Sequence, residues 1–293
     1  MLLALEVLQI IAPVFLLAGI GFVWAKLGFE YKVQFVTRLT MNLSVPALIF
    51  TALIKTEIDP DALKITALAA AVAYVGVALA SAGLLRLGRL SQRTFLAPMV
   101  FGNTGNLGLP LAFFAFGQVG FDYAVVVFAV MAFMSFTVGV WLVSGNGSPL
   151  SALKQPMVWA TVFGSIFLIY GWSLPKWSMN TLELLGQIAI PLMLITLGVA
   201  ITRLKPAALG RAFGLSVLKL VICVVVPAAV GLWLGLPEIA FAALVVQVAT
   251  PVAVTSYMLA EKYGAEADEV AGLVVVSTLL SVLAIPLILA FVL

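Results

Sequence analysis

The chain has 293 residues, of which 64% are hydrophobic and only 9% are charged. Since an ordinary soluble domain has about 25% charged residues, this composition excludes a water-soluble globular protein and predicts a membrane protein surrounded by lipid. The net charge of +3 fits basic residues at the membrane faces, so no nucleic-acid partner is expected. With no histidine and one cysteine, Cys223, the chain should hold no Cys/His metal site, no cofactor and no intramolecular disulfide.

Charged and turn-forming residues divide the chain into ten apolar stretches, each close to the roughly 20 residues that a membrane-spanning helix needs. The stretches are 4–26, 33–54, 62–85, 95–117, 121–143, 156–174, 179–202, 211–235, 238–260 and 267–293. The first is too long for the apolar part of a signal peptide and has no basic segment before it, so we expect it to be retained. The sequence therefore predicts an all-α integral membrane protein with ten transmembrane helices.

Basic residues are distributed unevenly between the loops that join these ten spans. Loops after odd-numbered spans contain eleven of the fifteen Lys and Arg residues, and loops after even-numbered spans contain three. The remaining one, Lys219, lies inside the eighth span. Because loops rich in Lys and Arg stay in the cytoplasm, the odd-numbered loops are predicted to be cytoplasmic and both termini extracytoplasmic.

Four of the stretches contain a proline with a side-chain amide four residues before it. A proline inside a helix cannot donate to the carbonyl four residues back, so each of these helices should carry a freed carbonyl. Within a membrane, such broken backbone is tolerated only where it is buried in protein or lines a wet cavity. The four breaks therefore predict a polar site inside the membrane. The pairs are Asn42 and Pro46, Asn106 and Pro110, Gln187 and Pro191, and Gln247 and Pro251.

The two halves of the chain resemble each other around these prolines. Residues 42–51 and 187–196 each carry an amide, a proline and a threonine at the same offsets, the threonines being Thr51 and Thr196. Each half has five spans, an odd number, so the second half should enter the membrane with the opposite orientation. Inverted repeats with broken helices are common in secondary transporters, whose substrate sites lie where the breaks meet. The predicted parts are a first repeat at 1–143, a cytoplasmic linker at 144–155 and a second repeat at 156–293.

Segments around two of the breaks also resemble the auxin efflux carrier family. Residues 101–110 resemble its Asn-Thr-x-x-x-Gly-x-Pro segment in span 4, and residues 246–251 and 260–263 resemble its Gln-x-x-x-Pro and Ala-Lys-Glu-Tyr segments in span 9. The resemblance covers essentially the whole chain and implies membership of the bile acid/arsenite/auxin carrier-like superfamily. It also implies a five-plus-five inverted repeat in which helices 4 and 9 are unwound at Pro110 and Pro251 and cross beside an anion-binding site.

Members of this family include bacterial dicarboxylate carriers and plant auxin carriers. The plant proteins usually have a long hydrophilic loop between spans 5 and 6, whereas this chain has only residues 144–155 there. The chain is therefore similar to prokaryotic members and is predicted to lie in the bacterial inner membrane. By the same resemblance, spans 2 and 7 would form a scaffold and a homodimer contact. One departure is Gln155 followed by Pro156, where the family often has Asn-Pro.

A helix that restarts in the middle of the membrane presents free N–H groups and the positive end of its dipole, which favour an anion. Two such ends could hold a carboxylate without an arginine. The polar residues nearby could instead patch the proline breaks or join helices, but four coinciding amide–proline pairs favour a binding site. The predicted substrate-binding residues are Asn103, Thr104, Asn106, Gln247, Thr250 and Thr255, and the supporting residues are Asn42, Thr51, Gln187 and Thr196.

Lys219 lies about 12 Å into span 8 at 1.5 Å per residue. Its ammonium could reach the cytoplasmic interface by snorkelling, or it could support the site as a counter-charge or an internal cation. No carboxylate lies at the centre of a span, so a relay of Asp, Glu and His is not visible. The coupling ion, Na⁺ or H⁺, therefore stays open, as does transport driven by membrane potential alone.

These features predict a secondary transporter that moves a small organic anion, a mono- or dicarboxylate or an auxin-like acid, by alternating access. The alternative on the same fold is an anion channel or a ligand-sensing receptor, because the sequence does not show whether both sides of the site open together. Saturable flux with counter-transport would favour the carrier, and ohmic current the channel. No enzyme activity is expected, since the close acidic pair Asp59 and Asp61 lies in a loop beside lysines.

Overall fold

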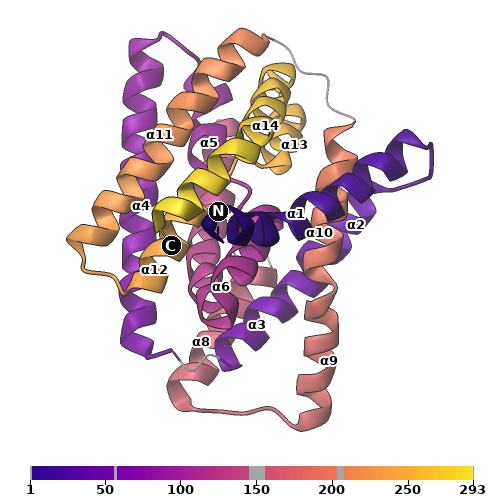
Figure 1. Cartoon of the computed structure of the whole chain (residues 1–293), viewed down its shortest axis with the longest axis vertical. Helices are drawn as coiled ribbons and strands as arrows, with labels where there is room; N and C mark the ends of the chain where they lie inside the picture. Colours follow the sequence, from indigo (N-terminus) through magenta and orange to yellow (C-terminus); the bar gives the residue numbers. More distant parts are fainter. Residues whose placement is uncertain (1, 56–57, 145–155, 203–207, 293) are drawn as a thin grey trace.

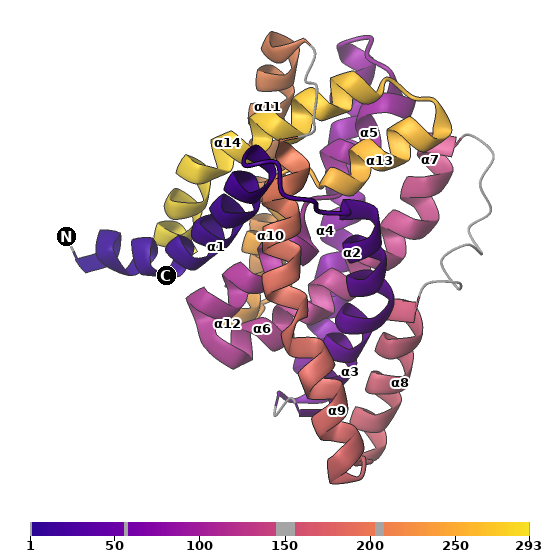
Figure 2. The ribbon, with the colours of Figure 1, turned by 90° about the vertical axis from the view of Figure 1, so that its right-hand side faces the viewer.

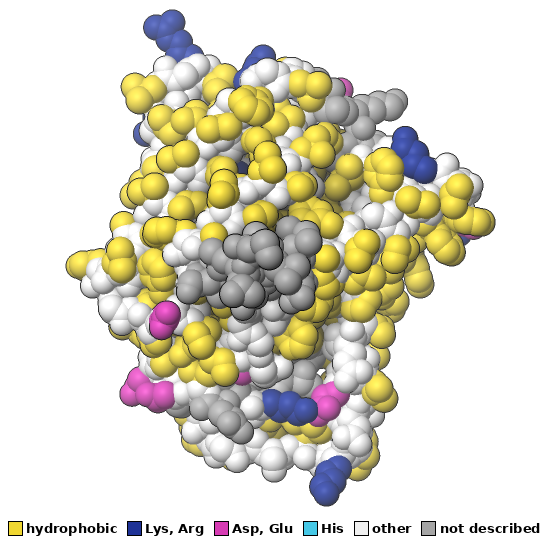
Figure 3. Space-filling model, viewed as in Figure 1, with side chains coloured by type: hydrophobic (Ala, Val, Ile, Leu, Met, Phe, Trp, Pro, Cys, Tyr) yellow, Lys and Arg dark blue, Asp and Glu magenta, His cyan; other side chains and the backbone are white. Residues whose placement is uncertain are grey.

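The computed structural model describes residues 2–55, 58–144, 156–202 and 208–292. Within these residues the secondary structure is helical, with one isolated β-bridge and no strand. Hydrophobic side chains cover most of the face seen in Figure 3, and charged side chains lie mainly toward its upper and lower ends. The chain is therefore a multi-pass membrane protein, as its composition predicted. Six helical stretches of the described residues are long and apolar enough to cross a membrane: Val33–Lys55, Asp61–Leu87, Thr104–Ser144, Lys176–Val199, Leu209–Trp233 and Ala267–Val292.

Four long helices run without interruption. Helix α4 begins with proline after the N-cap residue Asp59, whose side chain accepts from the backbone N–H of Asp61 at 3.2 Å. This start is stable because a proline in the first turn loses no helical hydrogen bond and an aspartate cap satisfies a free N–H. Helices α4 and α11 lie side by side along one edge of the molecule (Figure 1). The four helices are α1 (Leu2–Lys26), α4 (Pro60–Leu87), α11 (Leu209–Trp233) and α14 (Ala267–Val292).

The predicted spans 2, 4, 7 and 9 are each interrupted near the proline with the preceding amide. In spans 2 and 4 the interruption includes a five-residue π-helical turn that ends two residues before the proline. A wider turn relieves the clash between a proline ring and the carbonyl four residues back. The segments are α2 (Val33–Leu39), η1 (Thr40–Ser44) and α3 (Val45–Lys55); α5 (Gln92–Val100), η2 (Thr104–Gly108) and α6 (Leu109–Met134); α9 (Lys176–Gln187) and α10 (Ala189–Ile201); and α12 (Glu238–Val248) and α13 (Val254–Tyr263).

Proline alone does not break a helix in this protein. Pro13, Pro227 and Pro286 lie inside the continuous helices α1, α11 and α14. Gln9 precedes Pro13 with the same spacing as the four predicted pairs, yet α1 continues through it. The amide–proline spacing therefore identified four interruptions but is not sufficient to cause one.

Helix α6 contains the turn between the fourth and fifth predicted spans. Its backbone leaves helical geometry at Gly117, where φ is 65° and ψ is −157°. This conformation lies in the region that glycine adopts without steric cost, so the residue type suits the reversal. After α6 the chain continues through a third π-helical turn, η3 (Ser135–Gly139), into α7 (Val140–Ser144).

Glycines allow two helix pairs to pack closely. A Cβ atom on Gly198 of α10 would overlap the carbonyl oxygen of Ala18 on α1, and one on Gly164 of α8 (Pro156–Tyr170) would lie 3.0 Å from Leu53 on α3. Figure 2 shows α1 crossing α10 and α8 lying next to α3. Apart from these pairs, the long helices α4, α11 and α14 pack with the broken helices α5, α6 and α12, and α1 also contacts α6 and α14.

Candidate functional site

The two most strongly interrupted helices meet at their non-helical stretches. Helix α5 ends at Val100, and the backbone at Phe101 is extended, with φ of −95° and ψ of 111°. Gly102 and Val252 then form an antiparallel β-bridge, and the N–H of Asn103 donates to the carbonyl oxygen of Pro251 at 2.7 Å. Each broken helix thus supplies hydrogen-bond partners for backbone groups that the other has released, as buried backbone requires.

The break in the fourth span does not lie where we predicted it. The non-helical stretch is at 101–103, whereas Pro110 lies in the first turn of α6. The π-helical turn η2 lies directly before α6, and the N–H groups of both Leu107 and Gly108 donate to the carbonyl oxygen of Asn103, at 3.0 and 3.1 Å. In the ninth span, by contrast, Pro251 does lie in the non-helical stretch, as predicted.

A glycine fixes the position of the crossing. A Cβ atom on Gly102 would overlap Thr250 Oγ1 and would lie 2.8 Å from the carbonyl oxygen of Thr250. Backbone at this distance cannot move aside as a flexible side chain can. The chain therefore opens at Gly102 because only a residue without a side chain lets the two backbones approach.

The sequence contains a pattern that marks the two π-helical turns η1 and η2. Residues 40–46 read Thr-Met-Asn-Leu-Ser-Val-Pro and residues 104–110 read Thr-Gly-Asn-Leu-Gly-Leu-Pro. Both segments form a π-helical turn followed by an α-helix with proline as its second residue. The pattern Thr-x-Asn-Leu-small-x-Pro, shared by spans 2 and 4 of the same half, would have identified both turns.

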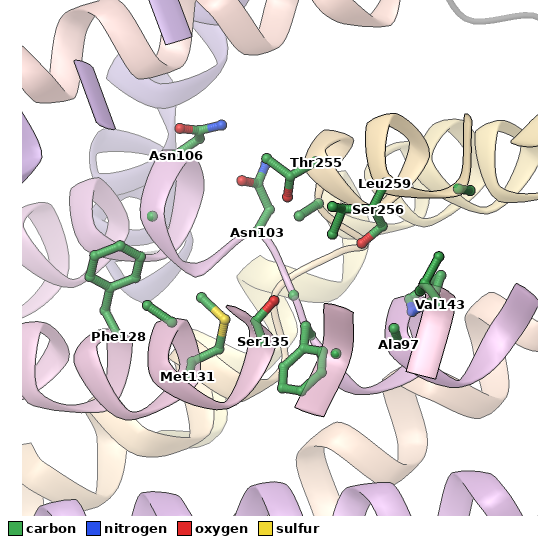
Figure 4. A pocket seen from close by; sticks show the side chains of 18 of the residues that line it. Ala97, Asn103, Asn106, Phe128, Met131, Ser135, Val143, Thr255, Ser256 and Leu259 are labelled. Carbon is green, nitrogen blue, oxygen red and sulfur yellow. The ribbon is translucent and has the colours of Figure 1, made fainter. Parts of the chain in front are cut away.

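A cavity of about 80 Å³ opens beside the β-bridge, and we call it the break cavity. One side is apolar, with Phe128, Met131 and Met157. Figure 4 shows Asn103, on the stretch between α5 and η2, next to Thr255 at the start of α13. The polar side chains of its lining are Thr94, Asn103, Asn106, Ser135, Thr255 and Ser256.

A smaller cavity of about 20 Å³ adjoins it, and we call it the threonine cavity. It shares Met41, Asn106 and Thr255 with the break cavity and adds the hydroxyl-bearing residues Thr37, Thr40 and Thr196. Each of the four helices that the prolines interrupt contributes at least one polar residue to this cavity. These residues are Thr37 and Thr40 from span 2, Asn106 from span 4, Thr196 from span 7 and Thr255 from span 9.

Several polar atoms at the crossing are buried and have no hydrogen-bond partner among the described residues. Asn103 is 3% exposed, and its Nδ2 is one of these atoms, together with Thr40 Oγ1, Thr104 Oγ1 and Gln247 Oε1. A buried polar group left unsatisfied costs about 1–3 kcal/mol. Unpaired donors and acceptors at one place are typical of a site that a ligand or ordered water completes.

The structure brings half of the predicted substrate-binding residues to the break cavity. Asn103, Asn106 and Thr255 line it, whereas the other three pack behind the crossing. Gln247 Nε2 donates to the carbonyl oxygen of Ala124 at 3.4 Å, and Thr250 Oγ1 donates to that of Gln247 at 2.8 Å. Thr104 is fully buried and does not line the cavity. Gln247 and Thr250 therefore bond to helix backbone and not to groups in the break cavity.

Of the predicted supporting residues, only Thr196 reaches the site. Asn42 is exposed, and Thr51 and Gln187 line a separate open cavity of about 400 Å³ beside the ion pair of Lys55 and Glu183, which are 2.7 Å apart. Asn42 and the threonine cavity lie on different sides of the same π-helical turn.

Thr196 also forms a hydrogen bond with a residue that lies outside the helices. Its Oγ1 and the hydroxyl of Tyr31, in the connection between α1 and α2, are 2.7 Å apart and hydrogen bonded. Burial raises the pKa of the Tyr31 phenol above its ordinary value, against a smaller opposite effect of this hydrogen bond. The phenol is therefore neutral at physiological pH, so the bond persists across that range.

Lys219 does not snorkel to an interface. It is 2% exposed, and its Nζ donates to the carbonyl oxygen of Met99, near the end of α5, at 3.3 Å. It lines a third cavity of about 20 Å³ together with Thr250 and Pro251, so its ammonium lies at the crossing.

Comparison with known proteins gives two matches that extend over almost the whole chain. A family model described as membrane transport protein matches residues 6–152 and 145–289. An uncharacterized transporter of Methanothermobacter thermautotrophicus is 26% identical over 292 aligned residues, which cover 95% of this chain and 96% of that protein. Both matches include the two broken helices and the cavities between them.

Proposed function

Since the chain belongs to the auxin efflux carrier family of membrane transport proteins, we propose that it is a secondary transporter for a small organic anion. The observation that carries this proposal is the break cavity, which lies where two broken helices cross and has the unpaired amide nitrogen of Asn103 in its lining. Transporters commonly place the substrate at such breaks. The cellular location we propose is the inner membrane of a prokaryotic cell, with both termini outside the cytoplasm.

The charge of the substrate follows from the ends of the broken helices. The helical segments η2 and α13 start at Thr104 and Val254, next to the cavity, and each presents N–H groups and about half a positive charge. Asn103 Nδ2 is an unpaired donor at the same place. An anionic group such as a carboxylate satisfies these donors better than a neutral group does.

The lining of the cavities favours one carboxylate over two. No Lys or Arg side chain is among the residues that line the break cavity or the threonine cavity in the described chain. A second carboxylate would have to lie against the apolar side formed by Phe128, Met131 and Met157. A cavity of roughly 150 Å³ binds benzene, so a volume of about 80 Å³ suits a short-chain monocarboxylate.

Alternating access requires two units that move against each other, and the packing supports a division into two. Helices α1 and α10 pack together, as do α3 and α8, and these pairs would correspond under an inverted five-plus-five repeat of ten spans. In that repeat, residues 1–143 match 156–293. The moving units are not these two repeats: one unit would comprise the helices of the two pairs, and the other the remaining spans. The threonine cavity has Thr40 and Thr196 on the first unit and Asn106 and Thr255 on the second. Rocking of the units would therefore open the site to one side of the membrane at a time.

The test is uptake by purified protein in liposomes, with acetate, propionate, butyrate and valerate against succinate and glutarate. A carrier shows saturable uptake and counterflow, a channel shows current proportional to voltage, and a receptor shows binding without flux. Imposed gradients of Na⁺, H⁺ and membrane potential then identify the driving force. Absence of saturable uptake for every acid in the panel would contradict the proposal.

A further inference from the structure

The side chain of Lys219 lines a cavity beside Thr250 and Pro251, and this cavity shares no lining residue with the break cavity. Its ammonium contacts the carbonyl oxygen of Met99 at 3.3 Å and Cys223 Sγ at 3.6 Å. None of the ion pairs found within the described residues involves Lys219. A charge buried in a membrane protein without a carboxylate partner is costly, which makes it a candidate for a specific role.

The partner that Lys219 has is the negative end of a helix. Met99 is the next-to-last residue of α5, so its carbonyl is one of the four that the broken helix leaves without an intrahelical partner. The end of a helix carries about half a negative charge. One ammonium therefore more than offsets the partial charge of this helix end.

Hydroxyl-bearing residues line the cavity that Lys219 also lines. Ser216, Thr250, Ser277 and Ser281 line the same cavity as Lys219, which we call the lysine cavity. Ser216 is 2% exposed, and its Oγ has no hydrogen-bond partner among the described residues. At about 20 Å³ the cavity has room for about one water molecule, whose oxygen would accept from the ammonium.

Different side chains form hydrogen bonds with the backbones of the two broken helices. Lys219 of α11 binds the carbonyl of Met99 on the first, and Ser277 Oγ of α14 accepts from the N–H of Val252 on the second at 3.0 Å. Both contacts are adjacent to the β-bridge between Gly102 and Val252. Only the first of these groups carries a charge.

We propose that Lys219 is a resident cation at the crossing, which supplies the positive charge that a bound alkali ion would otherwise bring. Carbonyls and hydroxyls at broken helices are the usual ligands of coupling cations in transporters, and here an ammonium occupies that environment. Anion binding in the break cavity then needs no Na⁺ or K⁺. The statement about anion binding rests on the proposed function, whereas the statement that Lys219 fills a cation site does not.

The cation site is tested without any substrate. Lys219→Ala removes the butylammonium side chain and leaves space for a small amine. Propylammonium should raise the melting temperature of this variant in detergent and leave the wild type unchanged. The control is Leu218→Ala, which changes a neighbouring, 42% exposed residue of α11 and should show no response to the amine. Equal responses of Lys219→Ala and Leu218→Ala would overturn the cation site.

The consequence for transport is tested in liposomes with butyrate as the probe. Wild-type uptake should be equal in Na⁺, K⁺ and choline media, and Lys219→Met should bind the anion at least about tenfold more weakly, since the charge near the site is lost. Lys219→Arg should retain most of the affinity. Sodium-dependent wild-type uptake, or unchanged affinity in Lys219→Met, would overturn the proposal. If no acid is transported by the wild type, the proposed function fails and the propylammonium result still decides the cation site.

Discussion

The two broken helices look alike in sequence but are broken in different ways. In the ninth span Pro251 lies inside the non-helical stretch, whereas in the fourth span the stretch lies at 101–103 and Pro110 belongs to the helix that follows. The backbone of the first helix accepts a hydrogen bond from the charged side chain of Lys219, and the backbone of the second donates one to the neutral hydroxyl of Ser277. The comparison teaches that a proline marks a helix that is easily interrupted, whereas contact with the opposing backbone determines where the non-helical stretch lies.

The largest effect on this comparison should come from Gly102→Ala. The new methyl group would lie against the carbonyl oxygen of Thr250, so the two backbones must separate and the β-bridge is lost. Overpacking of this kind typically costs about 1–3 kcal/mol, and the variant should melt at a clearly lower temperature and show no uptake. Gly214→Ala, on α11 with no atom within 4 Å of the added Cβ, is the control and should not be destabilised. A normal melting temperature for Gly102→Ala would show that the crossing is looser than we describe.

Asn103→Ala should have the next largest effect, and it should act on binding rather than folding. Removing the amide leaves a bound carboxylate with one donor fewer, which weakens binding by about 1–3 kcal/mol. Asn42→Ala provides a matched control, because Asn42 is exposed and lines neither the break cavity nor the threonine cavity. Titration of both variants with butyrate measures the difference. Equal affinities for the two variants would place the site elsewhere.

The third prediction compares the two prolines. Pro251→Ala frees a backbone angle within the break and adds an N–H group that needs a partner there, so the maximal rate of counterflow should fall. Pro110→Ala lies in a helical turn and should change the rate less. Both variants should keep their stability within about 1 kcal/mol, the usual size of such changes. A larger loss of rate in Pro110→Ala would contradict the assignment of the break to 101–103.

Much of the fold was predictable because it depends on local chemistry. Apolar length and charge predicted the helical stretches, and the prolines of spans 2, 4, 7 and 9 predicted which of those helices are interrupted. The pairing of Gly102 with Val252 was not predictable, since it joins residues that are distant in sequence.

The directions in which individual side chains point were predicted less well. Asn42 was chosen as a site residue, but Thr40 and Met41 line the threonine cavity, and Asn42 is exposed. A π-helical turn holds an extra residue, so the helical period of 3.6 residues no longer tells which side chains share a face beyond it. Gln247 and Thr250 lie just before a break, and their side chains bond to backbone carbonyls of the packed helices and do not line the break cavity.

The smallest effect that we predict concerns Tyr31, which ties the connection between α1 and α2 to the threonine cavity. Tyr31→Phe removes the hydroxyl that is bonded to Thr196, a bond that should contribute about 0.5–1.5 kcal/mol. Thr196→Val removes the other partner, so the double variant should lose less stability than the sum of the two single changes. Thr37→Val is the control, since Thr37 lines the same cavity and its change should add independently to Tyr31→Phe. Strict additivity of Tyr31→Phe and Thr196→Val in melting experiments would mean that the bond contributes nothing, and Thr196 would then be available to the substrate.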